Sequence, residues 1–160
     1  MENPSVTVIV LNWNGKDLTI GCINSLKKVN YSNFNILLVD NGSSDGSVEL
    51  LKEKFPEVPT LSLEKNFGFA GGNNRGFGSL KSDPPEFIIF LNNDTTVDNN
   101  FIEPLVKCLL NNKHASQAVP KIYYEDDPKL IWYAGGIVNL WTGSISVSYT
   151  HLTLPTICSV

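Results

Sequence analysis

The sequence predicts an α/β fold in which a mostly parallel sheet is flanked by helices. Four short apolar runs rich in β-branched residues begin at Val6, Phe34, Thr60 and Phe87, roughly 27 residues apart. This interval matches a strand, a crossover helix and the next parallel strand. A polar cluster follows each run, as expected where parallel strands end at one edge of a sheet.

The four runs are expected to be strands with helices between them. The strands are predicted at Val6–Leu11, Phe34–Val39, Thr60–Leu63 and Phe87–Leu91. From helical spacing of apolar residues, the helices are predicted over Leu18–Val29, over Val48–Phe55 after an N-cap at Ser44, from within Phe69–Asn74 to about Leu80, and over Phe101–Leu110. Beyond Pro120 we expect a loop over Tyr123–Pro128 and a strand over Ile131–Val138 interrupted by Gly135 and Gly136.

Length and composition bound the class of protein. The chain has 160 residues, of which 42% are hydrophobic, and a formal net charge of −4. We expect one domain over residues 1–146, and no nucleic-acid partner because no general positive charge is present. No apolar run approaches the ~20 residues of a membrane span, no secretory signal opens the chain, and peripheral membrane contact stays open. Three cysteines without CxxC spacing indicate neither a disulfide framework nor a zinc site and favour a cytoplasmic setting.

Asp40 ends the second predicted strand and precedes a turn rich in glycine and serine. A carboxylate there can accept hydrogen bonds from a nucleobase N–H or a ribose hydroxyl. It can equally cap its own turn, because Asx turns are common at strand ends. The residues alone leave these two interpretations in balance.

The segment from Asn66 to Gly76 places small residues where a loop meets a helix. Backbone N–H groups there can approach a diphosphate closely, and we favour this interpretation slightly over a tight loop that needs glycine for steric reasons. The segment is not a P-loop, since no Gly-Lys-Ser or Gly-Lys-Thr follows, and it lacks the GxGxxG spacing.

Asp94 follows Asn92 and Asn93 at the exit of the fourth predicted strand. Mn²⁺ or Mg²⁺ at a diphosphate takes oxygen ligands from one or two carboxylates and from the phosphates, and neutralises the leaving group. Asp94 can supply one such ligand. Taken alone, a segment of this kind is more often a turn that merely ends a strand.

In order and spacing, these clusters resemble those of family 2 glycosyltransferases, which have the GT-A fold. The matching segments are 8–15, 39–47, 66–76 and 91–95. The resemblance implies inverting transfer of a sugar from a UDP- or dTDP-sugar donor to a saccharide or lipid-linked saccharide acceptor, in cell-surface polysaccharide synthesis. The Asn-Asn-Asp-Thr variant, the Gly-Phe-Ala-Gly-Gly-Asn variant and the segment 131–136 resemble the rhamnosyltransferase-like branch.

The resemblance also implies roles for particular residues. Donor contacts are expected from residues at the four strand ends: Leu11, Asn12, Trp13, Asn14, Asp40, Asn41, Gly42, Asn66, Gly68, Ala70, Gly71, Asn74, Asn92 and Asn93. Asp94 is the expected ligand of the divalent cation, Mn²⁺ or Mg²⁺. Asn92 replaces the first carboxylate of the family's DxD motif and brings no charge, so cation affinity would depend on Asp94 and on the donor diphosphate.

By the same resemblance, the catalytic base lies beyond the end of this sequence, so no catalytic residue is assigned. We therefore expect an incomplete, truncated GT-A domain that binds donor without turnover, and a non-native tail over residues 147–160. Glu125–Asp127 is expected to be a solvated loop and not a substitute base.

Two other classes of protein remain as alternatives. One is a nucleotide-binding module without chemistry, which the unassigned base leaves open. The other is a nucleotidyltransferase, which would need a basic or glycine-rich loop directly after the first strand. Residues 12–16 offer one lysine there, so the nucleotidyltransferase is disfavoured.

Overall fold

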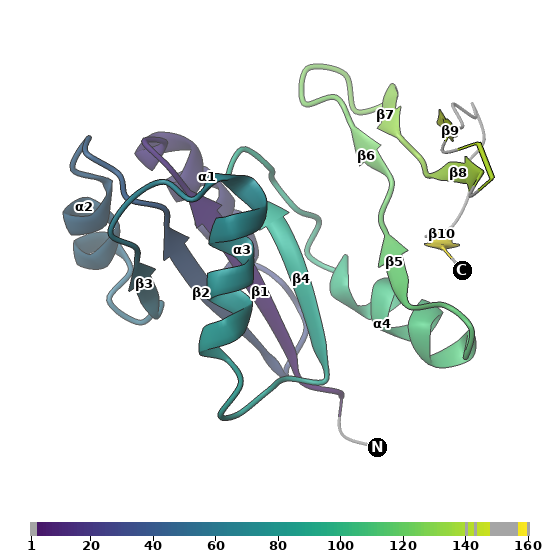
Figure 1. The fold of residues 1–160 in the computed structure, drawn as a ribbon, viewed down its shortest axis with the longest axis horizontal. Helices are drawn as coiled ribbons and strands as arrows, with labels where there is room; N and C mark the ends of the chain where they lie inside the picture. The colour runs from purple at the N-terminus through teal and green to yellow at the C-terminus, as the bar shows by residue number, and fades with distance from the viewer. Residues whose placement is uncertain (1–2, 140, 143, 148–156, 160) are drawn as a thin grey trace. The chain divides into compact units, whose positions relative to one another are not determined.

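The computed structural model describes residues 3–139, 141–142, 144–147 and 157–159. The chain comprises two compact units, Met1–Asn100 and Phe101–Val160. The first unit carries the predicted parallel sheet (Figure 1). Most of the predicted tail, residues 148–156 and 160, lies outside the described residues.

The sheet of the first unit has the strand order β3-β2-β1-β4, and all neighbouring strands are parallel. The strands are β1 (Val6–Asn12), β2 (Phe34–Asp40), β3 (Thr60–Ser62) and β4 (Phe87–Asn92). All four predicted strands are confirmed to within one residue at each end. Because Val6 pairs with both Phe34 and Phe87, the carboxyl ends of β1, β2 and β4 finish at the same edge.

Helices cover both faces of this sheet. They are α1 (Lys16–Leu26), α2 (Ser47–Lys54) and α3 (Gly68–Ser79). α3 lies over one face (Figure 1), where Ile9 and Val39 form the buried core. A Cβ added at Gly76 of α3 would lie 2.7 Å from Cγ2 of Val39, so a glycine lets the helix approach the sheet closely.

On the opposite face, the side chains that alternate with Ile9 along β1 are buried together with those of α1. Val8, Val10, Ile23 and Leu26 are all fully buried there. The sheet is thus covered on both faces, which explains why its central strand reads as a continuous apolar run.

The helices lie where predicted, but their ends differ: α1 runs from Lys16 to Leu26 and not from Leu18 to Val29, and α3 begins at Gly68, just before the predicted window. The N-cap of α2 differs as well. α2 is capped by Gly46 in the left-handed conformation, with φ at 78°, and not by Ser44. Instead, the Asp45 carboxylate accepts hydrogen bonds from the N–H and the hydroxyl of Ser47. The Ser47 hydroxyl lowers the pKa of the Asp45 carboxyl. The Asp45 side chain, and not that of Ser44, therefore accepts the first backbone N–H of this helix.

The second unit contains α4 (Ile102–Asn111), in contact with β5 (Gln117–Val119). β5 pairs antiparallel with β10 (Ile157–Ser159). Two further antiparallel pairs join β6 (Ile122–Tyr123) to β7 (Ile131–Tyr133) and β8 (Gly136–Asn139) to β9 (Ser144–Val147). Glu125–Asp127 lies exposed between β6 and β7, as predicted, although Tyr123, predicted to begin this loop, still belongs to β6. The predicted strand over Ile131–Val138 is two strands, and the break falls at Ala134 and Gly135, one residue before the predicted Gly135 and Gly136.

The cysteines and the charges complete the description. Cys22 is free and buried, whereas Cys108 is disulfide-bonded, a bond that the spacing of the cysteines in the sequence did not indicate. Among the residues that the structure describes, no helix is long and apolar enough to cross a bilayer.

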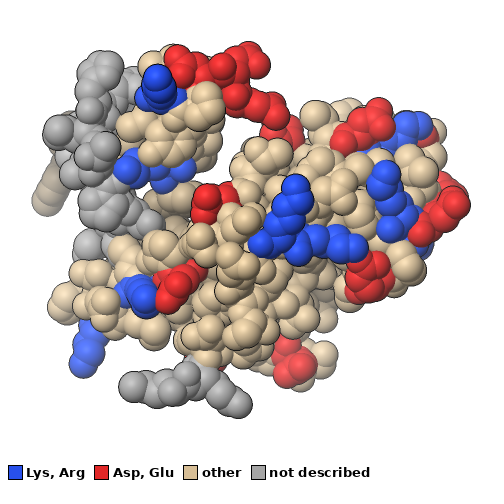
Figure 2. All heavy atoms as spheres, turned by 180° about the vertical axis from the view of Figure 1, so that it is seen from behind, with Lys and Arg blue, Asp and Glu red and all other residues tan. Residues whose placement is uncertain are grey.

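On the face shown in Figure 2, basic and acidic side chains are interspersed and no broad basic patch stands out.

Candidate functional site

An open pocket of about 320 Å³ lies at the carboxyl ends of the parallel strands in the first unit. It is lined by Leu11, Trp13, Asn41, Asn66, Gly68, Phe69, Asn92, Asn93 and Asp94. All of these except Phe69 belong to the predicted set of site residues. The parallel register explains why four segments far apart in the sequence meet at this one place.

Beneath the pocket lies a floor of buried polar side chains, Asn12, Asp40 and Asn41, with exposed fractions of 0%, 1% and 2%. Asn12 donates from Nδ2 to Oδ1 of Asp40 at 2.7 Å. The Asp40 Oδ2 accepts the N–H of Ser43 at 2.9 Å. Asp40 therefore does cap its own turn, and both of its oxygens are already hydrogen-bonded within the protein.

Asn41 holds the start of α3 against the end of β2. Its Oδ1 accepts the N–H of Phe67 at 3.0 Å, and its Nδ2 donates to Oδ1 of Asn66 at 2.9 Å and to the Gly68 carbonyl at 3.2 Å. Gly68 and Phe69, the first residues of α3, line the pocket. The Gly68 N–H donates to Oδ1 of Asn66 at 2.7 Å, but the N-terminus of a helix still carries a partial positive charge, so this end of α3 favours a negatively charged ligand.

The turn after β2 is shaped by Gly42. Its φ is 74°, and a Cβ there would lie 2.5 Å from the Lys65 Cα. A side chain would thus be strained and would collide with backbone. Gly42 lets the β2–α2 turn lie against the segment that leads into Asn66.

Asn14 joins the exits of β1 and β2. It adopts a positive φ of 49°. Its N–H donates to Oγ of Ser43 at 2.9 Å, and its Oδ1 accepts the N–H of Ser44 at 2.8 Å. Asn14 thus stabilises the edge of the sheet without lining the pocket.

The exposed rim of the pocket contrasts with its floor, because two polar side chains there, those of Asn92 and Asp94, are not used within the described protein. The side chains of Asn92 and Asp94 are exposed, and neither makes a hydrogen bond to another described residue. Among the described residues, no three His, Cys, Asp or Glu side chains cluster to hold a metal ion. Among the described residues that line the pocket, Asp94 is the one carboxylate, and it fits as a single ligand of a divalent cation whose other ligands come from phosphate or water.

The negative charge of Asp94 affects the pKa of the buried Cys22 thiol of α1. Burial and, to a smaller extent, the negative charge of Asp94 together raise the pKa of the Cys22 thiol to about 12. The sulfur of Cys22 also lies 3.7 Å from the Asn92 carbonyl oxygen, to which it donates. The exit of β4 is therefore packed directly onto α1.

Not all predicted residues reach the pocket. Asn12, Asn14, Asp40 and Gly42 lie below or beside it, and a further set on α3 does not line it: Ala70, Gly71 and Asn74. Sequence reasoning assigned no role to Phe69, which lines the pocket with 62% of its surface exposed, like Trp13 with 55%. The sequence signal that could have identified Phe69 is a large apolar side chain within a glycine-rich segment.

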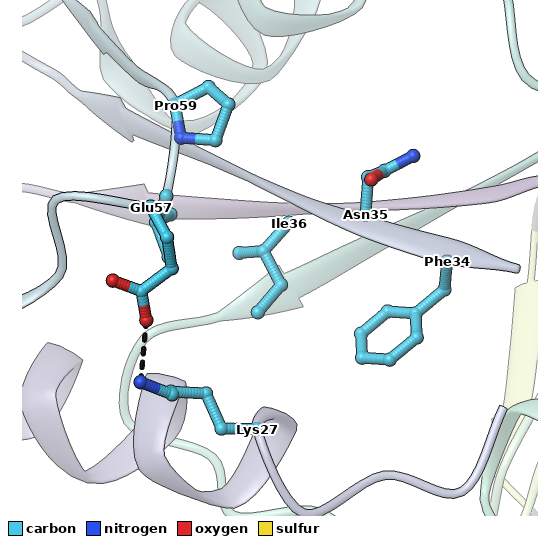
Figure 3. Close-up of a pocket in the computed structure, with 7 residues that line it drawn as sticks. Lys27, Phe34, Asn35, Ile36, Glu57 and Pro59 are labelled. Carbon is cyan, nitrogen blue, oxygen red and sulfur yellow. Dashed lines mark hydrogen bonds and ion pairs between the residues drawn. The ribbon is translucent and has the colours of Figure 1, made fainter. Parts of the chain in front are cut away.

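A second pocket, of about 210 Å³, lies beside the start of β2 (Figure 3). The Lys27 ammonium and the Glu57 carboxylate close one side as an ion pair at 2.5 Å. Lys27 lowers the pKa of the Glu57 carboxyl. The rest of the lining is largely apolar, with Phe34, Ile36 and Pro59, and contains no predicted site residue. We assign this pocket no function.

Comparison with known proteins finds a family whose sequence model matches this chain. The sequence model described as Glycosyl transferase family 2 matches residues 7–154. Glycosyltransferase GlyA of Streptococcus pneumoniae serotype 4 is 27% identical over 136 residues, which are 83% of this chain and 19% of that protein. The Escherichia coli UDP-Glc:alpha-D-GlcNAc-diphosphoundecaprenol beta-1,3-glucosyltransferase WfgD is 28% identical over 113 residues, 70% of this chain and 44% of that protein. The chain thus spans less than half the length of these curated relatives.

Solved structures share the fold. The mannosyltransferase PcManGT from Pyrobaculum calidifontis, in complex with GDP-Man and Mn²⁺, superposes with a TM-score of 0.62 at 22% identity, covering 78% of this chain and 37% of that one. S. aureus TarS 1-349 in complex with UDP-GlcNAc gives a TM-score of 0.56 at 19% identity, over 74% and 40% of the two chains. These likenesses confirm the predicted α/β architecture of GT-A type.

Proposed function

The chain belongs to glycosyl transferase family 2, and on this premise we propose that its open pocket binds a nucleoside-diphosphate sugar as the donor in glycosyl transfer. The observation that carries the proposal is the convergence of four strand-end segments on one pocket of about 320 Å³. This volume lies within the range of small-molecule sites. The pocket combines aromatic and amide side chains, a helix N-terminus and one carboxylate, which together suit a base, a diphosphate and a cation.

Within this proposal, different pocket-lining residues contact different parts of the donor. Leu11 and Trp13 would face the base and ribose, and Asn66 and Gly68 the diphosphate. Asn41, whose amide is used within the protein, would hold the start of α3 beside them. Asn92 and Asn93 would contact the donor near the cation. The remaining predicted contacts, Ala70, Gly71 and Asn74, stay predictions. Asn12, Asn14, Asp40 and Gly42 contribute by holding the floor and the edge, because their side chains or backbones are used within the protein.

Asp94 would hold Mn²⁺ or Mg²⁺ together with the donor phosphates. The cation supplies charge neutralisation for the departing nucleoside diphosphate. The N-terminus of α3 would stabilise the same negative charge through its partial positive charge and the N–H groups that follow Gly68, whose own N–H donates to Oδ1 of Asn66 at 2.7 Å. In the inverting reaction, the acceptor hydroxyl attacks the anomeric carbon as the bond to the diphosphate breaks. No described residue is assigned as the base that takes the hydroxyl proton.

The finer identity of the substrates is also a proposal. A UDP- or dTDP-sugar donor is supported by the resemblance to the rhamnosyltransferase-like branch and by the UDP-glucose named for WfgD. A lipid-linked saccharide acceptor is supported by the diphosphoundecaprenol acceptor in the same name. Such acceptors would place the reaction at the cytoplasmic face of a membrane, in the synthesis of a cell-surface polysaccharide.

Calorimetric titration tests the donor site. UDP and dTDP would be titrated into the chain with and without Mn²⁺, and into the variants Asp94→Asn and Asp98→Asn. Asp98 is an exposed carboxylate four residues further on, which caps the Asn100 N–H at 2.8 Å and does not line the pocket. We expect Mn²⁺ to tighten nucleotide binding, and Asp94→Asn to remove about tenfold of that gain. Asp98→Asn should bind like the wild type.

The outcomes separate the possibilities. Absence of binding by a folded wild-type chain, at millimolar nucleotide with Mn²⁺, would overturn the donor-site proposal. Equal losses in both variants would point to a general charge effect and not to a ligand at Asp94.

A second candidate is a module that binds the nucleotide sugar without transferring it. It is favoured by one observation: Asp94 is the only acidic residue lining the described pocket, and it is already assigned to the cation. Release of UDP from a bound UDP-sugar by the wild-type chain, with and without added saccharide, would distinguish transfer from binding alone.

A further inference from the structure

The segment that carries the cation ligand is fastened to the protein through a residue of its own. Asn93 lies between the exposed side chains of Asn92 and Asp94 but is only partly exposed. Its Nδ2 donates to the Oγ1 of Thr19 at 2.9 Å and lies 3.4 Å from Oδ1 of Asn12. The middle residue of the segment is therefore anchored while its two neighbours remain free.

Thr19 is the other end of this anchor. It lies on α1 with no exposed surface. Its Oγ1 donates to Oδ1 of Asn12 at 2.8 Å, and the Gly15 carbonyl, 3.0 Å away, is a second acceptor within reach. A hydroxyl has one proton and two lone pairs, so it can donate to Asn12 and accept from Asn93 at the same time. One buried hydroxyl thus joins the exits of β4 and β1.

The start of α1 leaves the room that Asn93 needs. A Cβ added at Gly15 would lie 2.7 Å from Nδ2 of Asn93. The collision would be with a side chain that is held by two partners and cannot move aside freely. Gly15 and Thr19, one helical turn apart, together accommodate the Asn93 side chain: Gly15 leaves it space and Thr19 accepts its hydrogen bond.

α1 touches the same segment at two further points. Cys22 donates from its sulfur to the Asn92 carbonyl at 3.7 Å, and the Ser25 hydroxyl accepts the Val97 N–H at 3.2 Å. Of the three tethers, the one from Thr19 is the only one that reaches a side chain between Asn92 and Asp94. Ser25 acts three residues beyond Asp94, outside the pocket.

We propose that Thr19 is a positioning residue for the donor site. By accepting the hydrogen bond of Asn93, it fixes the segment from Asn92 to Asp94 in one arrangement and so sets the affinity for nucleotide with cation, without touching either ligand. This inference rests on the proposed function of the pocket. The physical reason is preorganisation, because a segment that is already ordered loses less conformational freedom on binding.

The test compares Thr19→Val, which removes the hydroxyl at nearly constant shape, with Thr19→Ser, which keeps it. Ser25→Ala is the matched control, since it removes a hydroxyl tether from the same helix to Val97, three residues beyond Asp94 and outside the pocket. Titration of UDP with Mn²⁺ should show about a tenfold weaker affinity for Thr19→Val. Thr19→Ser and Ser25→Ala should stay within about twofold of the wild type, whatever their effect on the unfolding midpoint.

A second readout does not depend on ligand. The Thr95 N–H donates to the Asn92 carbonyl at 3.3 Å, so its hydrogen exchange reports on the segment. We expect exchange at Thr95 to become about tenfold faster in Thr19→Val and to be unchanged in Thr19→Ser. Unchanged exchange together with unchanged affinity in Thr19→Val would overturn the inference.

The two proposals fail in different ways. If the wild type binds no nucleotide while Thr95 exchange rises in Thr19→Val, the donor-site proposal fails and Thr19 positions the segment for some other purpose. If the wild type binds and Ser25→Ala weakens binding as much as Thr19→Val does, the specific role of Thr19 is overturned while the donor site stands.

Discussion

The floor and the rim of the pocket are made of the same kinds of side chain and are used in opposite ways. On the floor, Asn12, Asp40 and Asn41 are buried, and their polar atoms are bonded to one another and to backbone. On the rim, Asn92 and Asp94 are exposed and make no side-chain hydrogen bond to other described residues. An amide or a carboxylate at a strand end is therefore not by itself a ligand-binding group. Whether it binds ligand or stabilises the fold depends on how many partners the surrounding segments already supply.

The largest effect is expected on the floor. Asp40→Ala should lower the free energy of unfolding by about 3 kcal/mol, because it leaves the buried Asn12 amide and the Ser43 N–H without their acceptor. Denaturant titration would measure the loss. The control Asp98→Ala removes an exposed carboxylate and should cost about 0.5 kcal/mol. Similar losses in the two variants would show that the floor is no more important to the fold than the surface.

A gain of function is expected on the rim. Asn92→Asp restores a second carboxylate beside Asp94 and should raise the affinity for Mn²⁺, in the presence of UDP, by about tenfold. Stability should change by less than about 0.5 kcal/mol, because the side chain is exposed. Paramagnetic resonance of free Mn²⁺ would measure the affinity. Asn99→Asp adds the same charge outside the pocket and should have little effect; an equal gain there would mean that net charge alone attracts the cation.

A smaller effect is expected from the aromatic part of the rim. Phe69→Ala should weaken binding of UDP and of a UDP-sugar by about fivefold, the contribution of one aromatic contact. Phe77→Ala is the control, because Phe77 is exposed on the same helix and does not line the pocket. Calorimetry on both variants measures the difference. Equal affinities would leave Phe69 without a role in the pocket.

The smallest effect concerns the core beneath the rim. The pKa of Cys22 is raised from 9.0 to about 12, first by burial and then by the charge of Asp94. A raised pKa keeps the thiol neutral, so its contribution to stability is present below pH 9 and is lost as the pH rises towards 12. We expect iodoacetamide to label Cys22 slowly in the native chain at about pH 8 and rapidly in denaturant. Native labelling at the denatured rate, followed by mass spectrometry, would contradict the burial.

Much of the fold followed from the spacing of apolar runs. Each of the four apolar runs became a parallel strand. The central strand β1 is buried on both faces, which requires a continuous apolar sequence. The short strands β5 and β10 were not predicted, since three residues carry too little periodicity and depend on pairing with a distant segment. The N-cap at Ser44 was wrong for a local reason: Asp45 lies one residue closer to the helix and bonds its first donor.

The site shows the same division at the level of single residues. By itself, the sequence determined which side chains arrive at the edge of the sheet, because the apolar runs define where each strand ends. Only the tertiary structure decided which of them turn inward. Asn93 is anchored to Thr19, 74 positions away, while Asn92 beside it stays free, and no local pattern separates the two. The reason is physical: the orientation of a polar side chain is determined by partners that distant segments bring within hydrogen-bond reach only when the chain is folded.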